Sequence, residues 1–377
     1  MLAIDHVEPS TVHQGTPAHR DHSIDWLRGL ALIVILVDHI EIVIHQDILR
    51  NITLYRYGLS DGLDAFVFLS GFSFGIVHSR VQQRSFFTSQ LKACQRAFAL
   101  ATFNCVVLIC VLILSWVCRP PYSILAHVEL AQAMIDPMTA ISNAAILRFQ
   151  PFGFVVLPLY VGILILAPSM LWIARRSGAL ALIVSVSLYL LALTFPSITP
   201  KVSGGGLWEF HPLAWQLVFF IGMLSSRGCK FLSSNGQSVS RALIYFGLFV
   251  MMTIYSKEII RLSTEFDARW LIDKRIPGPI RLLHFLLLAG FTSCVVRHFQ
   301  SIGVFEQRNW LCLVGRHSLP VYMSGLWLTY LAAFFMNSAA TVEIICFEAN
   351  AILLSIGVAW AFDHHRYDSR RIAPECK

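Results

Sequence analysis

Long apolar runs separated by short charged segments constrain this chain more than any other feature of its sequence. A run of about 20 apolar residues, each rising roughly 1.5 Å along a helix, spans the hydrocarbon core of a bilayer. A helix satisfies its own backbone hydrogen bonds, so it crosses lipid without help from water. The pattern therefore predicts an all-α, polytopic helical bundle whose surroundings are the lipid bilayer.

The composition points the same way. Hydrophobic residues make up 56% of the chain and charged residues only 14%, whereas a soluble domain carries about 25% charged residues. A net charge of +7 would suit a nucleic-acid partner, but arginines at the ends of membrane helices give the same excess, so we expect no nucleic acid. The nine cysteines lie mostly inside apolar runs and form no CxxC pair, so we expect neither a disulfide framework nor a metal site.

Ten apolar segments are predicted to span the membrane, which places both termini on one side. Most of the 29 Lys and Arg residues fall inside the cell if the termini are cytoplasmic, as the positive-inside rule requires. We therefore expect a polar cytoplasmic tail over 1–22, one membrane domain over 23–362 and a cytoplasmic tail over 363–377. The predicted spans are 27–47, 60–78, 97–117, 153–174, 178–196, 212–226, 242–260, 280–298, 318–336 and 342–362.

The first predicted span carries ionisable side chains, which are costly in a membrane and usually face a cavity or a partner. Arg28 and His39 are eleven residues apart. At about 100° per residue they share one helix face, roughly 16 Å apart along the axis. Asp25 lies one turn before Arg28 on that face and can pair with it. Asp38 points about 100° away from His39, so we do not expect it to orient that ring.

Five segments in order carry a resemblance to a known family. The first is residues 24–39, with arginine and histidine separated by ten residues, and the second contains the element FVFLSG. Together they resemble the integral-membrane acyltransferases and, within them, the OpgC succinyltransferases of osmoregulated periplasmic glucans, over about residues 22 to 336. The second segment, which contains FVFLSG, is LSDGLDAFVFLSGFSFG at 59–75. The last three are FHPLAWQLVFFIG at 210–222, PGPIRLLHFLLLA at 277–289 and GRHSLPVY at 315–322.

The resemblance implies a function and roles for two residues of the first span. His39 corresponds to the essential catalytic histidine, and Arg28 to the arginine that helps bind the acyl donor. The donor is a cytoplasmic acyl-CoA, with succinyl-CoA implied, and the acceptor is a glucan outside the bacterial inner membrane. A cationic mouth suits the phosphates of coenzyme A, and a histidine suits a general base for a sugar hydroxyl. Direct transfer and an acyl-histidine intermediate both remain open.

Further residues are candidates for the same site. Asp25 and Arg316 join Arg28 at the donor site, although Arg316 is equally well explained as a topology signal on the cytoplasmic side. Asp61 and Asp64 either orient His39 or pair with an arginine. The remaining candidates are possible pocket residues at the outer ends of spans, namely His211 and Gln216 in the sixth span and Arg281 and His284 in the eighth.

Two alternatives to succinyl transfer stay open at this point. In the first, the protein is still an acyltransferase, but it transfers an acetyl group to another surface polysaccharide or to a lipid-linked sugar. In the second, the protein is a transporter or flippase that catalyses no reaction, which would also explain ten spans and buried charge. Transporters often show inverted repeats, and no internal repeat is evident in this sequence.

Overall fold

The computed structural model describes residues 21–57, 59–80, 86–227, 238–300 and 309–372. Over these residues the chain is helical, and its extended pairing is limited to an isolated bridge between Lys201 and Leu207. The predicted all-α fold is therefore confirmed. The long helices are α1 (His22–Val43), α2 (Gly62–Arg80), α3 (Phe86–Cys118), α7 (Val156–Arg176), α8 (Gly178–Thr194), α9 (Pro212–Arg227), α10 (Ser238–Ile254), α12 (Pro279–Gln300), α14 (Ser318–Phe335) and α15 (Thr341–Ile372).

Shorter helices connect the long ones. Three of them fill the segment between α3 and α7, and α13 leads directly into α14. The short α-helices are α4 (Tyr122–His127), α5 (Ala131–Ile135), α6 (Pro137–Ala145), α11 (Ser256–Glu265) and α13 (Trp310–Arg316). The 3-10 helices are η1 (Arg50–Ile52), η2 (Leu54–Tyr57), η3 (Pro196–Ile198) and η4 (Arg269–Leu271).

Each of the ten predicted spans overlaps one of the long helices. Five helices of the described residues, α3, α7, α12, α14 and α15, are long and apolar enough to cross a membrane, so the chain is a multi-pass membrane protein. Helices α2, α8 and α9 are apolar but shorter, and α1 carries six ionisable side chains: His22, Asp25, Arg28, Asp38, His39 and Glu41. The number ten and the cytoplasmic termini remain predictions, and residues 1–20 and 373–377 of the predicted tails lie outside the described residues.

The seventh predicted span, 242–260, differs from the observed helix. Helix α10 ends at Ile254, and α11 continues at an angle of 56° to it. The reason lies in composition, because α11 carries Lys257, Glu258, Arg261 and Glu265 within ten residues. These charges favour contact with water over continuation of an apolar span.

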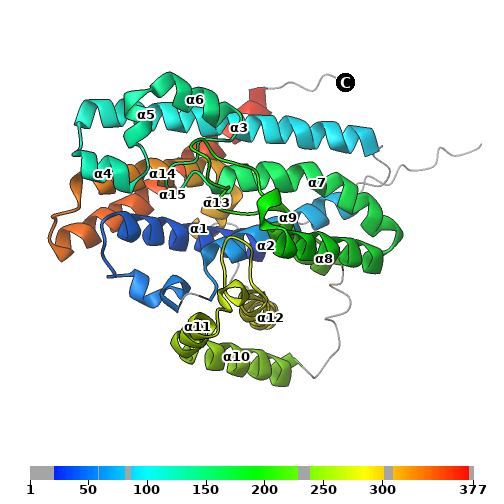
Figure 1. Cartoon of the computed structure of the whole chain (residues 1–377). Coiled ribbons are helices and arrows are strands. Elements are labelled where there is room, and N and C mark those ends of the chain that lie inside the picture. Colours follow the sequence, from blue (N-terminus) through cyan, green and yellow to red (C-terminus); the bar gives the residue numbers. More distant parts are fainter. Residues whose placement is uncertain (1–20, 58, 81–85, 228–237, 301–308, 373–377) are drawn as a thin grey trace, which may run out of the picture.

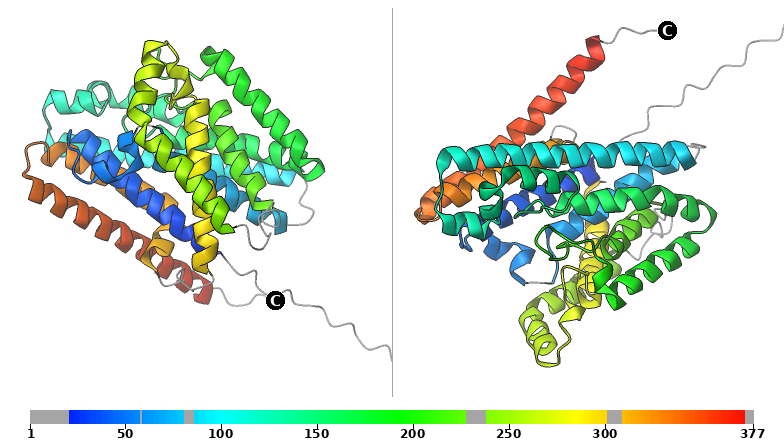
Figure 2. Two further views of the ribbon diagram at one scale, coloured as in Figure 1. Left: turned by 90° about the horizontal axis from the view of Figure 1, so that it is seen from below. Right: turned by 45° about the horizontal axis from the view of Figure 1, so that its top comes forward.

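The helices pack around α1. In Figure 1, α1 lies in the middle of the molecule, with α3 to α6 on one side and α10 to α12 on the other. The two views of Figure 2 agree with this order. Helix α1 contacts α2, α13 and α14, while α2 packs along α9 and α3 packs along α7. The charged first span is therefore enclosed by other helices.

The interior and the periphery differ as expected for a membrane bundle. Large aromatic side chains are fully buried at its centre, among them Trp215, Phe219 and Tyr330. By contrast, α3 and α15 expose many apolar side chains, such as Trp116 and Leu353, along their outward faces. Because lipid is as apolar as these side chains, such exposure is normal for helices at the edge of a membrane bundle.

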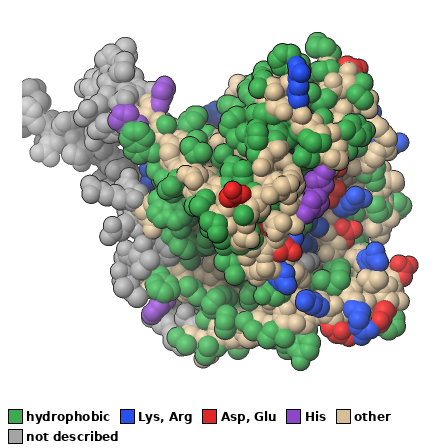
Figure 3. Space-filling model, turned by 90° about the vertical axis from the view of Figure 1, so that its left-hand side faces the viewer, with side chains coloured by type: hydrophobic (Ala, Val, Ile, Leu, Met, Phe, Trp, Pro, Cys, Tyr) green, Lys and Arg blue, Asp and Glu red, His purple; other side chains and the backbone are tan. Residues whose placement is uncertain are grey.

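Charged side chains gather at one end of the bundle. Figure 3 looks onto the left-hand end of Figure 1, where α4 lies, and shows Lys, Arg, Asp and Glu side chains grouped on one part of that face. Apolar side chains cover much of the rest. Helix α1 runs from the middle of the molecule toward this end, so its last residues lie nearer to these charges.

Candidate active site

A cavity of about 930 Å³ opens beside the first half of α1. It lies between α1, α2, α3 and α7 and the chain around α13 and α14, and its walls include Arg28, Asp25 and Arg316. Binding pockets in proteins typically measure about 300–1,000 Å³. The three residues predicted for the donor site therefore come together in one cavity that has the size of a binding site.

Two glycines bring the basic residues of this cavity onto one wall. Gly29 of α1 packs directly on the backbone of α13, and Gly315 of α13 packs on the backbone at Asp25. A Cβ atom at either position would overlap the opposite backbone. The close approach of α1 and α13 places Arg28 and Arg316 around the same space.

Arg28 is held by neighbours from two other helices. Its Nη2 atom donates to the Ser318 hydroxyl at 2.7 Å, and its guanidinium lies 5.7 Å from the centre of the Phe66 ring. Asp25 is buried and lines the same cavity. The contacts with Ser318 and Phe66 hold the guanidinium of Arg28 at the cavity wall, so that it does not face lipid.

Arg316 presents unused hydrogen-bond donors. Its Nη1 atom lies 3.2 Å from an Asp363 oxygen, which also lies 3.0 Å from Nε2 of His317. The Nε and Nη2 atoms of Arg316 are buried and have no hydrogen-bond partner within the described residues. Because a buried donor without a partner is unfavourable, an anionic ligand in the cavity would stabilise this arginine.

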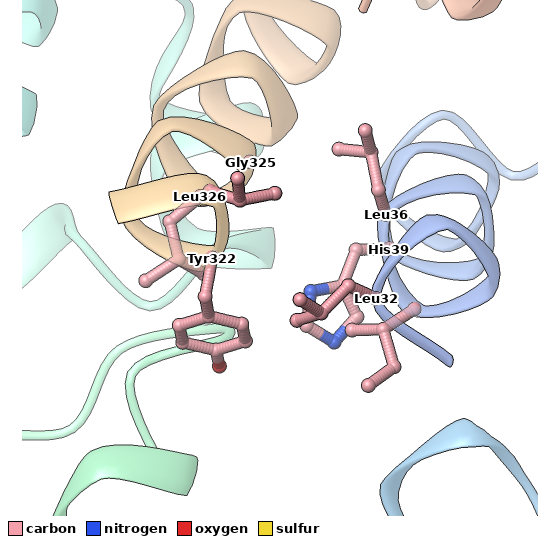
Figure 4. A pocket seen from close by; sticks show the side chains of 8 residues that line it. Leu32, Leu36, His39, Tyr322, Gly325 and Leu326 are labelled. Atoms are coloured by element: carbon pink, nitrogen blue, oxygen red, sulfur yellow. The ribbon is translucent and has the colours of Figure 1, made fainter. Parts of the chain in front are cut away.

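His39 lies in a separate, small pocket between α1 and α14. The pocket is lined by Leu32, Leu36, Tyr322 and other apolar residues, and Figure 4 shows the rings of His39 and Tyr322 turned into the gap between the two helices. The Phe152 ring meets the His39 ring edge-on at 5.4 Å. Within the described part of the chain the imidazole nitrogens of His39 have no hydrogen bond, so either nitrogen can meet a ligand.

Tyr322 belongs to both spaces. It lines the His39 pocket and also the large cavity that holds Arg28. Its hydroxyl donates to the carbonyl oxygen of Gly153 at 2.6 Å, which holds the ring between the two. Arg28 and His39 therefore face two different spaces, and Tyr322 of α14 lines both of them.

Asp38 does not contact His39. Its carboxylate accepts a hydrogen bond of 2.7 Å from the Thr53 hydroxyl in the connection after α1. The helical angle between the two side chains predicts this separation. Asp38 is buried near the end of α1 and lines neither the large cavity nor the His39 pocket.

Asp61 and Asp64 pair with Arg281. The Arg281 Nη2 atom lies 2.5 Å from an Asp64 oxygen and 3.2 Å from an Asp61 oxygen, and Lys274 Nζ lies 2.7 Å from Asp61. All but Lys274 are buried. Buried charges persist where they are paired and hydrogen bonded, so the network joins the start of α2 to α12 and to the loop before it. Of the two predicted roles, contact with an arginine is the one observed.

The remaining candidates are buried in packing contacts. The ring of His284 is hydrogen bonded with Ser60 at 2.7 Å and with Thr253 at 2.9 Å. Gln216 exchanges two hydrogen bonds of 2.7 Å with Ser185. His211 is buried, and its ring nitrogens have no partner among the described residues. The large cavity and the His39 pocket are lined by none of these three residues, and Arg281 lines neither space.

Sequence reasoning overlooked two residues of these cavities, Tyr322 and Tyr160. Tyr322 stands inside the segment GRHSLPVY, so a close reading of that segment would have singled it out. Tyr160 lines the large cavity and donates to the Ser70 hydroxyl at 3.0 Å. An isolated tyrosine in an apolar run carries no signal of such a role.

Comparisons with known proteins identify one family. A family model described as OpgC protein matches residues 20–367. The match includes α1 to α14 and most of α15 and so covers both cavities. No curated protein matches the chain, and no solved structure matches it.

Proposed function

The chain belongs to the OpgC family, and on that premise we propose that it is a membrane O-acyltransferase of the bacterial inner membrane. It moves a succinyl group from cytoplasmic succinyl-CoA to a hydroxyl of a periplasmic glucan. His39 is the catalytic base, and Arg28, Asp25 and Arg316 belong to the donor site.

One observation carries this proposal. The cavity of about 930 Å³ that gathers the basic residues and the pocket that holds His39 are both lined by Tyr322. An acyl-CoA has its phosphates at one end and its thioester at the other, joined by a long flexible arm. The large basic cavity has room for the phosphate end of such a molecule. The His39 pocket beside it measures about 10 Å³, so it must widen to admit the thioester end.

The charge of the large cavity supports a phosphate-bearing donor. Arg28, Arg96 and Arg316 all line it. Arginine presents a planar fork of donors that matches phosphate oxygens in pairs, and two donors of Arg316 are buried without a partner within the described residues. These donors favour an anionic ligand, such as the phosphates of a coenzyme A thioester, over a neutral sugar.

His39 is suited to proton transfer in the reaction. A neutral imidazole nitrogen accepts the proton of the acceptor hydroxyl while the hydroxyl oxygen forms a bond to the thioester carbonyl carbon. The carbon–sulfur bond then breaks, and the proton passes from His39 to the departing coenzyme A sulfur. The products are a sugar ester and free coenzyme A. The apolar walls of the pocket keep water away from the thioester, which limits hydrolysis.

Reconstituted protein tests the proposal. Purified chain in liposomes is supplied with radiolabelled succinyl-CoA on one side and a soluble glucan on the other, and ester-linked label in the glucan is measured. We expect label in the glucan with wild-type protein and none with His39→Gln, which keeps a polar side chain of similar length. Equal labelling by the two proteins would remove His39 from the mechanism.

A further inference from the structure

Tyr322 is the polar residue that connects the His39 pocket with the donor cavity. It lines the small pocket around His39 and also the large cavity around Arg28. Among the described residues that line the small pocket, His39 and Tyr322 are the two with polar side chains. A donor whose phosphates lie in the large cavity and whose thioester meets His39 therefore has the Tyr322 side chain beside it.

The Tyr322 hydroxyl is held close to the His39 ring through Gly153. It donates to the Gly153 carbonyl oxygen at 2.6 Å. Gly153 in turn lies against the imidazole, because a Cβ atom added to it would stand 3.8 Å from both Cε1 and Nδ1 of His39. Figure 4 shows the rings of Tyr322 and His39 on the two sides of the gap between α14 and α1. The two polar groups thus border one space from opposite helices.

The proposed reaction creates a charge that this hydroxyl can stabilise. When the sugar oxygen bonds to the thioester carbon, the carbonyl oxygen takes up negative charge, and enzymes stabilise that oxygen with hydrogen-bond donors placed beside it. His39 is occupied with the proton of the sugar. The other described side chains that line the pocket are apolar. The Tyr322 hydroxyl is therefore the side-chain donor that this part of the chain offers to the carbonyl oxygen.

The hydroxyl can leave Gly153 as the charge develops. A hydrogen bond to a charged acceptor is roughly twice as strong as one to a neutral carbonyl, so an oxyanion displaces the resting partner. The loop that contains Gly153 keeps other anchors. The Tyr330 hydroxyl donates to the Phe152 carbonyl at 3.0 Å, and the Phe152 amide donates to the Val128 carbonyl at 3.3 Å. A bond that strengthens in the transition state raises the rate of the chemical step.

We propose that Tyr322 is a catalytic residue that donates a hydrogen bond to the carbonyl oxygen of the acyl group during transfer. The inference rests on the proposed function and adds a second group to its chemistry. His39 takes the proton of the sugar hydroxyl as the new carbon–oxygen bond forms, and Tyr322 stabilises the negative charge on the carbonyl oxygen. The carbonyl then re-forms, the carbon–sulfur bond breaks, and His39 gives its proton to the departing sulfur. Tyr322 keeps its own proton and returns to the Gly153 carbonyl.

Tyr330 provides a matched control on the same helix. Tyr322 and Tyr330 are both buried in α14, and each donates through its hydroxyl to a carbonyl of the same loop. Tyr330 lines neither the His39 pocket nor the large cavity. Replacing either tyrosine with phenylalanine removes one hydroxyl and one bond to the loop. A purely structural role therefore predicts the same result for both variants.

Steady-state kinetics of the reconstituted full chain separate the two roles. Wild type, Tyr322→Phe and Tyr330→Phe are supplied with succinyl-CoA and a soluble glucan, and kcat and the KM for succinyl-CoA are measured. We expect Tyr322→Phe to lower kcat by about 100- to 1,000-fold, as the loss of one donor to an oxyanion does. Its KM should stay within about threefold of wild type, because the bond belongs to the transition state. Tyr330→Phe should stay within about threefold of wild type in both values.

Three results would overturn the assignment. An equal fall in kcat with the two variants would make Tyr322 an anchor of the loop. A higher KM with unchanged kcat would make it part of the donor-binding surface alone, and wild-type kinetics in Tyr322→Phe would remove it from the reaction. Failure of the proposed function is distinguishable from these results, because in that case the wild-type protein itself transfers no succinyl group to the glucan.

Discussion

Replacing Arg316 with methionine tests the donor site most sharply, because the structure gives the number of donors that are lost. Nε and Nη2 of Arg316 are buried without partners within the described residues, while Nη1 faces Asp363. Methionine keeps the length and apolar contacts of the side chain. Asp363 retains His317 at 3.0 Å, so we expect the protein to fold.

The size of the effect follows from these contacts. A hydrogen bond to a charged group contributes about 1.5–3 kcal/mol, and every 1.4 kcal/mol is about tenfold in binding. Loss of even one arginine–phosphate contact should therefore raise the apparent KM for succinyl-CoA by about 10- to 150-fold. The maximal rate should change little, because Arg316 lies away from the thioester end of the donor.

A donor without phosphates provides the decisive comparison. Initial rates are measured with succinyl-CoA and with the succinyl thioester of N-acetylcysteamine, which lacks every phosphate. Arg316→Met should act as wild type with the small thioester, and Arg176→Lys, a change at an exposed arginine outside the cavity, should act as wild type with both. A similar loss with both donors would show that Arg316 supports the fold and does not bind phosphate.

Three further predictions address other parts of the site. Arg28→Lys keeps the charge but loses the planar fork and its bond to Ser318, so steady-state kinetics should show weaker use of succinyl-CoA; unchanged donor kinetics would remove Arg28 from the donor site. Asp64→Asn leaves the buried Arg281 with Asp61 as its remaining carboxylate, and should lower the free energy of unfolding in detergent by about 3 kcal/mol; a loss below about 0.5 kcal/mol would show the pair to be unimportant. Reporter fusions at the C-terminus and in loop 261–279 should report opposite sides of the membrane, with the C-terminus cytoplasmic, and periplasmic activity at the C-terminal fusion would refute the topology.

The sequence predicts the helices of this chain well, because apolar runs have a direct physical meaning in lipid. Helical periodicity also places Arg28 and His39 on one face of α1, while their roles stay predictions that rest on the resemblance. Periodicity carries no information on which helices meet. Tyr322, which lines both cavities, comes from α14, and Arg316 lines the same cavity as Arg28 where two glycines let α1 and α13 pack closely.

Charge pairing shows the same limit more clearly. The sequence indicates that Asp61 and Asp64 need partners, because buried carboxylates are costly, but it leaves open whether His39 or an arginine supplies them. The fold brings α12 beside α2, and the pair is made with Arg281. In the sequence Lys274 is only one of several cations in the loop before α12, and its pairing with Asp61 is seen only in the fold.

The glucans of living cells test the central claim directly. Periplasmic glucans are isolated from cells that lack this chain and from cells that carry either the wild type or His39→Ala, and they are compared by anion-exchange chromatography and mass spectrometry. Each succinyl ester adds a carboxylate that is ionised at neutral pH, because carboxyl pKa values lie near four. We predict anionic, succinyl-bearing glucans only with the wild-type chain, at equal abundance of the two proteins in the membrane. Identical glucans from all three strains would contradict succinyl transfer to a periplasmic glucan, and succinylation by His39→Ala would contradict catalysis by His39.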